Sequence, residues 1–273
     1  MQVGFIGTGS MGSILIRSFI TSRALSPEQI IAYNRTPSKA LSLAQEYRGI
    51  SIAESNSEVV EKCDILFLCV KPFEYRQVLQ QVKQHFRAEQ ILITITSPVD
   101  IADLEQLVPC PVIRVVPSIT NAASSGLTLI EFGSQVTEGV RQTILSLVSH
   151  ISRPIEVKQT FLRIASDISS CGPAFLSYIL QQMIESAVQD YKISPEAATY
   201  LTTQMVIGFA DLLKQEIFSL PALQERVCVP KGITGEGLSA LQEHIPGVFN
   251  EVFHKTHAKF EEDCDEMKSQ LVE

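Results

Sequence analysis

Apolar residues in the first half of the chain fall in short continuous runs, and polar stretches with helical spacing separate them. The runs are QVGFIG, QIIAY, CDILFLCV, QILITIT and CPVIRVV. Continuous apolar runs of this length are typical of parallel strands that are buried on both faces of a sheet. Helices are predicted near residues 37–47, 74–86 and 100–107. The repeated order of strand and helix predicts a Rossmann-type, doubly wound α/β domain.

The pattern changes between residues 150 and 160, where SRPIEV reads as a last short strand and only helical spacing follows. This change predicts two domains, residues 1–158 and 159–273. Helices are expected from Gly172 to Lys192 and after the capping residue Ser194. Both helices carry apolar residues on more than one face and therefore need cover on more than one side. We expect a second copy of the chain to provide it, in a homodimer or a higher homo-oligomer built on dimers.

A glycine-rich stretch joins the first predicted strand to the first predicted helix. Its residues are Gly7, Thr8, Gly9, Ser10, Met11 and Gly12. In such a stretch the first glycine permits a tight turn, the second lets the backbone approach a pyrophosphate, and the third lets helix and strand pack closely. Because the motif lies between a strand and a helix, it predicts a dinucleotide site with the pyrophosphate at the helix N-terminus.

The end of the second predicted strand bears on the choice of cofactor. NAD-binding proteins usually place a carboxylate there to bind the ribose, whereas this chain has Asn34, Arg35 and Thr36. Arg35 can pair with a phosphate, Lys39 lies one turn further on, and Thr36 can cap the helix that follows. We therefore expect NADP(H) as the cofactor.

Ligands of doubly wound sheets collect at the carboxyl ends of the strands. This rule makes Val70, Lys71, Pro72 and Ser97 expected neighbours of the cofactor. Arg114 lies inside an apolar strand, so it needs a partner, and a structural ion pair is the favoured interpretation.

Composition and charge narrow the functional classes. The net charge is −8, so no basic surface is expected to attract nucleic acid or an anionic membrane. Six cysteines without a CxxC pair, no signal peptide and no apolar run of spanning length predict a cytoplasmic protein. His254, His257 and Glu261 share one helix, but a solvated charged face is favoured over a metal site there.

These segments resemble the pyrroline-5-carboxylate reductases, which use NAD(P)H to reduce a cyclic imine acid to proline. The likeness covers nearly the whole chain and includes GFIGTGSMG, NRT, CDILFLCVKP, IRVVP, SSCGPAF and VPKGIT. It implies an interlocked helical dimerisation domain after the dinucleotide domain. It also implies that Asn56 contacts the cofactor and that Ser97 lies beside the nicotinamide.

The resemblance assigns a substrate site to residues 229–234. In the family, a loop with two glycines and a following threonine holds the substrate carboxylate through backbone amides and a hydroxyl. The corresponding residues here are Pro230, Lys231, Gly232, Ile233 and Thr234. Thr234 is expected to orient the substrate and to donate a proton.

Several residues depart from the family pattern. Cys228 and Val229 replace hydroxyl residues, Lys231 replaces a glycine, and Ser118 stands where asparagine is common. A lysine in this loop could strengthen anion binding or could fill the substrate pocket. The departures indicate a divergent paralogue, of the type that bacterial late-competence operons encode.

Three alternatives to reduction of 1-pyrroline-5-carboxylate follow. The chain could be a catalytically drifted, NADP-binding regulatory paralogue, or a reductase of a different imine or carbonyl substrate. A β-hydroxyacid dehydrogenase has a similar N-terminal motif but needs a catalytic lysine on the first interdomain helix. No lysine lies between Lys158 and Lys192, which argues against that class.

Overall fold

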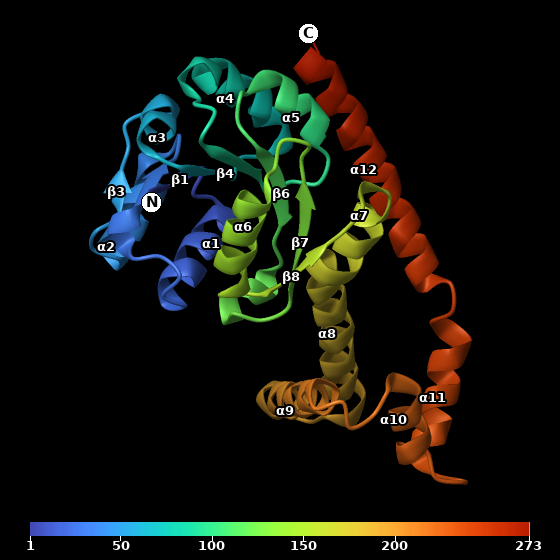
Figure 1. Cartoon of the computed structure of the whole chain (residues 1–273). Coiled ribbons are helices and arrows are strands. Elements are labelled where there is room, and N and C mark those ends of the chain that lie inside the picture. The colour runs from blue at the N-terminus through green and yellow to red at the C-terminus, as the bar shows by residue number, and fades with distance from the viewer. Residues whose placement is uncertain (273) are drawn as a thin grey trace. The chain divides into compact units, whose positions relative to one another are not determined.

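The structure is a computed structural model that describes residues 1–272, with side chains described as far as residue 269. The chain forms two compact units (Figure 1). The first unit contains Met1–Pro173 and the chain from Lys255 onward, and the second contains Ala174–His254. Packing defines these units, and the domain boundary expected after residue 158 stays a prediction.

An eight-stranded sheet forms the centre of the first unit, in the order β3-β2-β1-β4-β5-β6-β7-β8. The strands are β1 Val3–Ile6, β2 Ile30–Tyr33, β3 Ser51–Ile52, β4 Ile65–Leu68, β5 Ile91–Thr94, β6 Val112–Val116, β7 Leu127–Phe132 and β8 Arg153–Glu156. All neighbouring strands are parallel except β6 and β7. The predicted Rossmann-type parallel sheet is confirmed, with an antiparallel β6–β7 pair that the sequence did not predict.

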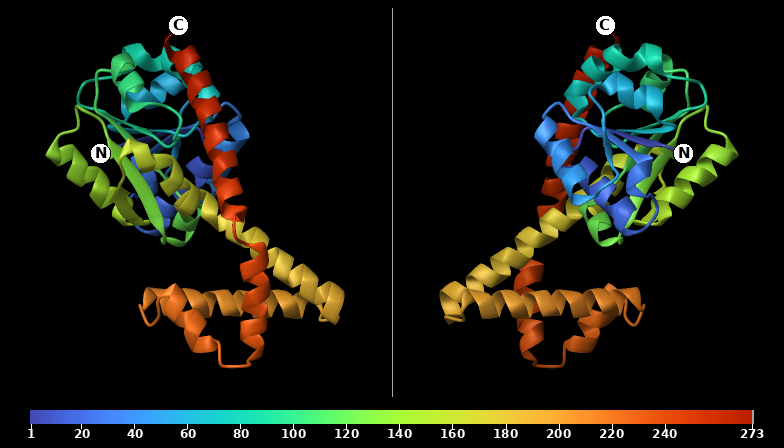
Figure 2. Two further views of the ribbon diagram at one scale, coloured as in Figure 1. Left: turned by 90° about the vertical axis from the view of Figure 1, so that its right-hand side faces the viewer. Right: turned by 90° about the vertical axis from the view of Figure 1, so that its left-hand side faces the viewer.

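Helices cover both faces of the sheet (Figure 2). They are α1 Ser10–Thr21, α2 Pro37–Glu46, α3 Asn56–Lys62, α4 Tyr75–Val82, α5 Ile101–Leu107, α6 Glu138–Ser149, α7 Gln159–Ser166 and α12 Val248–Val272. Side chains of α1, α2 and α6 form the core on one face, and those of α3, α4 and α5 form the core on the other. Met267 of α12 joins the second core and is 2% exposed. The C-terminal helix therefore helps to close the first unit.

Aromatic rings fix α1 against the middle of the sheet. The rings of Phe5 and Phe67, on neighbouring strands, stack with centroids 4.9 Å apart. Phe19 of α1 packs against Phe67 with centroids 5.7 Å apart. Because each ring buries a large apolar area, this contact holds the C-terminal part of α1 against the middle of the sheet.

A buried ion pair joins the antiparallel strands. Arg114 of β6 lies opposite Glu131 of β7, and its guanidinium donates to the Glu131 carboxylate and to the carbonyl of Val99. Arg114 is 1% exposed, and burial raises the pKa of Glu131 above its ordinary value despite the neighbouring guanidinium. The expected structural role of Arg114 is confirmed.

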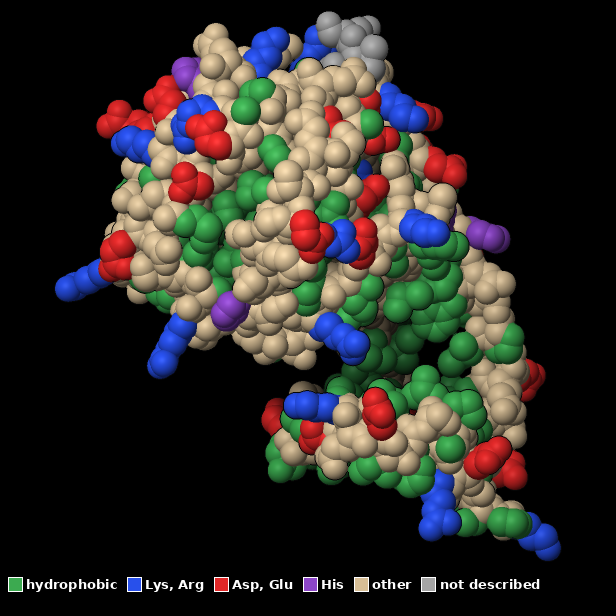
Figure 3. All heavy atoms as spheres, in the orientation of Figure 1, with side chains coloured by type: hydrophobic (Ala, Val, Ile, Leu, Met, Phe, Trp, Pro, Cys, Tyr) green, Lys and Arg blue, Asp and Glu red, His purple; other side chains and the backbone are tan. Residues whose placement is uncertain are grey.

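The second unit is helical, and apolar side chains lie on its surface (Figure 3). Its helices are α8 Gly172–Tyr191, which begins in the first unit, α9 Pro195–Lys214, α10 Leu220–Val227 and α11 Ile233–His244. No residue of α8 is buried, and α9 buries only Ala198 and Thr202. The exposed apolar residues of α8 and α9 include Tyr178, Met183, Tyr200, Leu201 and Met205. Among the described residues, no helix combines the length and apolar character that a membrane span requires.

The buried Arg114–Glu131 ion pair is expected to affect the free energy of unfolding. Replacing Arg114 by Met leaves a buried carboxylate without its cation, so we expect the free energy of unfolding to fall by about 3–5 kcal/mol. The double variant R114M/E131L removes both charges, and we expect it to regain more than half of that loss. Urea denaturation of both variants measures the difference. Equal losses in the single and double variants would contradict the claim that the unpaired Glu131 carboxylate causes the loss.

Candidate functional site

The glycine stretch forms a tight turn between β1 and α1. Gly7 has a φ of +99°, which favours glycine, and a Cβ there would lie 2.7 Å from the carbonyl oxygen of Cys69. A Cβ on Gly12 would lie 2.2 Å from the carbonyl oxygen of Gly7. The packing of helix against strand therefore requires glycine at both positions.

Gly9 differs from these two glycines, because a Cβ there would have no atom within 4 Å. It is the N-cap residue of α1, which has no side-chain capping hydrogen bond. Packing within the described residues therefore does not explain glycine at this position. The open space in front of a helix N-terminus fits a ligand phosphate that approaches the backbone closely.

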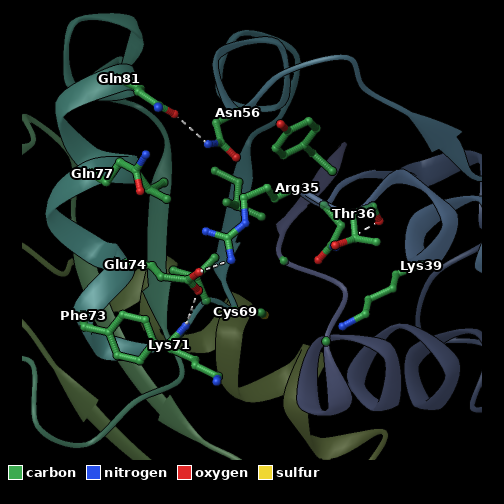
Figure 4. Close-up of a pocket in the computed structure, with 17 residues that line it drawn as sticks. Arg35, Thr36, Lys39, Asn56, Cys69, Lys71, Phe73, Glu74, Gln77 and Gln81 are labelled. Atoms are coloured by element: carbon green, nitrogen blue, oxygen red, sulfur yellow. Dashed lines mark hydrogen bonds and ion pairs between the residues drawn. The ribbon is translucent and has the colours of Figure 1, made fainter.

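A cavity of about 450 Å³ opens beside the turn (Figure 4). It lies at the carboxyl ends of β1, β2 and β4, where the strand order reverses. Ligands of doubly wound sheets bind at this place. Eight of the expected cofactor residues line the cavity: Gly7, Gly9, Asn34, Arg35, Thr36, Asn56, Val70 and Lys71. The other six, Thr8, Ser10, Met11, Gly12, Pro72 and Ser97, are not among its lining residues.

Asn34 connects the glycine turn to the end of β2. Its side-chain oxygen accepts a hydrogen bond from the backbone of Thr8 at 2.9 Å, and its amide nitrogen donates to the carbonyl of Thr36 at 3.0 Å. The structure therefore shows Asn34 positioning the turn. Thr36 is the N-cap residue of α2, as expected, and Pro37 follows it, but the Thr36 hydroxyl makes no capping hydrogen bond.

Five further lining residues come from the short 3₁₀ helix Pro72–Glu74 and from α4: Phe73, Glu74, Gln77, Val78 and Gln81. Glu74 pairs with Arg35 at 3.0 Å, and Gln81 accepts a hydrogen bond from Asn56 at 3.0 Å. Sequence reasoning missed all five residues. The available signal was their position in the helical segment that follows a strand at the sheet's switch point.

A second polar cluster of the first unit surrounds Ser97. Arg163 of α7 lies 3.5 Å from the Ser97 hydroxyl and pairs with the fully buried Asp167 at 2.7 Å. Asp167 also accepts a hydrogen bond from Thr256 of α12 at 2.9 Å. A short π-helix, Asp167–Cys171, follows α7. Sequence reasoning missed this cluster, although the spacing of four between Arg163 and Asp167 is typical of a helical ion pair.

Residues 229–234 form a turn and the start of α11. The backbone of Gly232 donates to the carbonyl of Val229 at 2.8 Å, and Lys231 has a φ of +61°. A turn with proline second and a left-handed third residue favours glycine at that third position, where this chain has Lys231. Gly232 is the N-cap of α11 without a side-chain cap, and Ile233 is 93% exposed. The first amides of α11 therefore receive no capping hydrogen bond from the side chain of the N-cap residue.

Two cysteines of the first unit, Cys63 and Cys69, are poor nucleophiles. Cys69 lines the cavity, and burial raises the pKa of its thiol far above the ordinary value. Burial likewise raises the pKa of Cys63 to about 12. A thiol is reactive as the thiolate, so these cysteines are expected to stay protonated near neutral pH.

His257 lies near a buried carboxylate. Its Nδ1 lies 3.8 Å from the carboxylate of Asp167. In the part of the chain that the structure describes, no group of three His, Cys, Asp or Glu side chains could hold a metal.

The turn, the cavity and the parallel sheet define a dinucleotide-binding domain, and the family matches place it among the NADP-dependent oxidoreductases. Residues 2–98 match the family described as "NADP oxidoreductase coenzyme F420-dependent", and residues 159–263 match "Pyrroline-5-carboxylate reductase dimerisation". Together with the absence of a ribose-binding carboxylate at the end of β2, the first match indicates NADP(H) as the cofactor.

The chain belongs to the pyrroline-5-carboxylate reductase family and is a divergent member. It is 45% identical to "ComE operon protein 4" of Bacillus subtilis (strain 168), over 99% of both chains. It is 27% identical to "Pyrroline-5-carboxylate reductase 3" of the same organism, over 95% of this chain and 96% of that protein.

Solved structures show the same fold. The Plasmodium falciparum pyrroline carboxylate reductase with NADP bound superposes with a TM-score of 0.83 at 23% identity, over 99% of this chain and 98% of that one. The Streptococcus pyogenes 1-pyrroline-5-carboxylate reductase gives a TM-score of 0.84 at 19% identity, over 97% and 98%. The expected Rossmann-type domain with a helical dimerisation domain is confirmed.

Gly9 borders open space whereas Gly12 is closely packed, so we expect alanine substitutions at these two positions to have different effects. The variant G9A adds a methyl group in open space, so its free energy of unfolding should change by less than about 1 kcal/mol. Its affinity for NADPH should fall at least about tenfold, because the methyl group occupies the space of the pyrophosphate. The variant G12A should instead lose stability by about 1–3 kcal/mol or more. Thermal unfolding and NADPH fluorescence titration separate the two effects. Unchanged NADPH affinity in G9A would contradict the assignment.

Proposed function

We propose that the chain is an NAD(P)H-dependent reductase of a cyclic imine acid, with reduction of 1-pyrroline-5-carboxylate to L-proline as the reaction to test first. The observation that carries this proposal is a turn and helix start at residues 229–234, in a chain that also holds a dinucleotide cavity. Such a helix start suits a small carboxylate, and such a cavity suits a hydride donor. Both features occur in a member of a family whose name describes this reaction.

The cofactor residues of the first unit divide into three groups. The glycine turn and the amides at the start of α1 would bind the pyrophosphate. Arg35, Thr36 and Lys39 would bind the 2′-phosphate, and Asn56, Val70 and Lys71 would line the rest of the cofactor site. Pro72, Thr8, Ser10 and Met11 stay predicted neighbours, as does Ser97 beside the nicotinamide. When bound, the cofactor supplies the hydride that reduces the imine carbon.

Reduction of an imine makes few demands on the protein side chains. The substrate already carries its electrophilic carbon, so the protein must hold that carbon near the hydride donor and supply a proton to the nitrogen. No nucleophile is needed, which agrees with the protonated state expected for Cys69. We assign substrate orientation and proton donation to Thr234.

The carboxylate of the substrate is assigned to the start of α11. The amides of residues 231–234 and the positive end of the helix favour an anion there. Among them, the amide of Gly232 also donates to the carbonyl of Val229 within the turn. Pro230 and Gly232 shape the turn, while Ile233 follows it as the first helical residue. Lys231 adds a positive charge within this turn, so a carboxylate is favoured over a neutral group.

A homodimer accounts for the surface of the second unit. The matched dimerisation family and the exposed apolar side chains of α8 and α9 support assembly through this unit. Large exposed apolar patches mark protein interfaces in soluble proteins. We propose a homodimer in the cytoplasm, with higher oligomers built on dimers as the alternative, and no nucleic-acid or membrane partner for a chain of net charge −8.

A regulatory NADP-binding protein is the second candidate. The observations that favour it are the replaced residues Cys228, Val229 and Lys231, together with 45% identity to a protein named for a competence operon. The intact turn and helix start favour the reductase over this candidate, because the backbone geometry that would bind the carboxylate is retained.

The variant T234A tests the reductase proposal. Loss of one hydrogen bond to a charged substrate group should lower kcat/KM for 1-pyrroline-5-carboxylate by about 10- to 100-fold, with NADPH affinity unchanged. The control S239A removes a hydroxyl from the same helix, where Ser239 donates to the carbonyl of Gly235 at 3.1 Å. We expect S239A to keep the wild-type kcat/KM in an NADPH oxidation assay. Equal activity in T234A and wild type would show that the loop is wrongly assigned.

A further inference from the structure

We propose that Glu74 controls selectivity for the 2′-phosphate of the cofactor, because its carboxylate competes with that phosphate for Arg35. Arg35 follows β2, and its side chain reaches towards Glu74, with 3.0 Å between Nη2 and Oε1 (Figure 4). Both residues line the cofactor cavity. Thus a carboxylate already occupies part of the guanidinium that a 2′-phosphate would use.

The two partners differ in how firmly the protein holds them. The other oxygen of Glu74, Oε2, accepts a hydrogen bond from the backbone of Lys71 at 3.2 Å. The backbone of Glu74 donates to the carbonyl of Lys71 at 2.9 Å, within the short 3₁₀ helix Pro72–Glu74. The Glu74 side chain is 20% exposed, whereas that of Arg35 is 78% exposed. Glu74 is therefore the fixed partner, and Arg35 is the one that can turn towards a ligand.

Binding of NADP(H) places the 2′-phosphate, a second anion, beside the Arg35–Glu74 ion pair. A 2′-phosphate carries nearly two negative charges, and Arg35 and Lys39 are the cations of the cavity wall near the end of β2. Either Arg35 leaves Glu74 for the phosphate, or it bridges both anions while they repel each other. Both routes weaken the binding of NADP(H).

NAD(H) has no 2′-phosphate, so the Glu74 carboxylate neither repels it nor competes with it for Arg35. Its ribose has a 2′-hydroxyl, which can donate a hydrogen bond to a carboxylate, as in NAD-binding proteins with an acidic residue at the end of the second strand. Here Glu74, which follows β4, would supply that carboxylate from a different element. It follows that Glu74 lowers the preference for NADPH over NADH.

The variant E74Q isolates the charge of this side chain. A glutamine keeps one oxygen to accept the Lys71 hydrogen bond, so the 3₁₀ turn should be retained. We expect the dissociation constant of NADPH to fall by about three- to tenfold at low salt, since two charges of the phosphate lose a repulsive neighbour. The dissociation constant of NADH should stay unchanged or rise. The gain for NADPH should shrink at high salt, where exposed charges are screened.

The measurement is a fluorescence titration of the full chain with NADPH and NADH, without imine substrate. The control E46Q makes the same change of charge at another ion pair, where Glu46 accepts from Arg17 at 2.8 Å outside the cavity lining. We expect E46Q to leave both affinities unchanged. The variant R35M should lower NADPH affinity, and adding E74Q to R35M should have a smaller effect than E74Q has alone, because the competition runs through Arg35.

Weaker NADPH binding in E74Q would overturn the proposal, since Glu74 would then hold Arg35 ready for the phosphate. An unchanged ratio of the two dissociation constants would overturn it as well. The inference rests on cofactor binding alone. A protein that binds NADPH but reduces no imine would contradict the proposed function and leave this inference standing.

Discussion

The candidate cofactor site depends on one close approach, between the start of α1 and the turn that ends β1. Only a glycine fits where Cβ of residue 12 would lie 2.2 Å from the carbonyl oxygen of Gly7. This contact, with Phe19 packed against Phe67, directs the N-terminus of α1 to the carboxyl ends of the strands. The free amides of a helix N-terminus and the open space at Gly9 follow from that placement. The cavity beside them is therefore a consequence of backbone packing.

The two candidate sites differ in how much the sequence could predict. Apolar runs predicted β1, β2, β4, β5 and β6, and the glycine spacing predicted the turn, because both patterns are local. The two-residue strand β3 contains no such run and was not predicted. Strand β7 was missed, since LTLIEF alternates less clearly and pairs antiparallel with β6. Glu74 was missed for a physical reason: it follows β4 whereas its partner Arg35 follows β2, so only the folded sheet brings the carboxylate and the guanidinium together.

The proposed substrate loop, residues 229–234, could not be found from sequence pattern alone. Its residues carry no pattern that reveals a ligand, and its assignment came from resemblance to a family. The structure adds the reason why a glycine suits residue 231, where the backbone adopts a φ of +61°. A lysine in that conformation retains the turn at a cost in backbone strain of about 1–2 kcal/mol. The departure therefore changes charge at the head of α11 while the turn itself persists.

The central claim is that this protein transfers a hydride from NADPH to a cyclic imine that carries a carboxylate. The most direct test mixes NADPH-loaded protein with 1-pyrroline-5-carboxylate and follows both NADPH oxidation and proline formation. The account predicts one proline formed for each NADPH consumed, and slower turnover of 1-pyrroline, which lacks the carboxylate. Tight NADPH binding with no oxidation by either imine would contradict the account and would favour the regulatory paralogue.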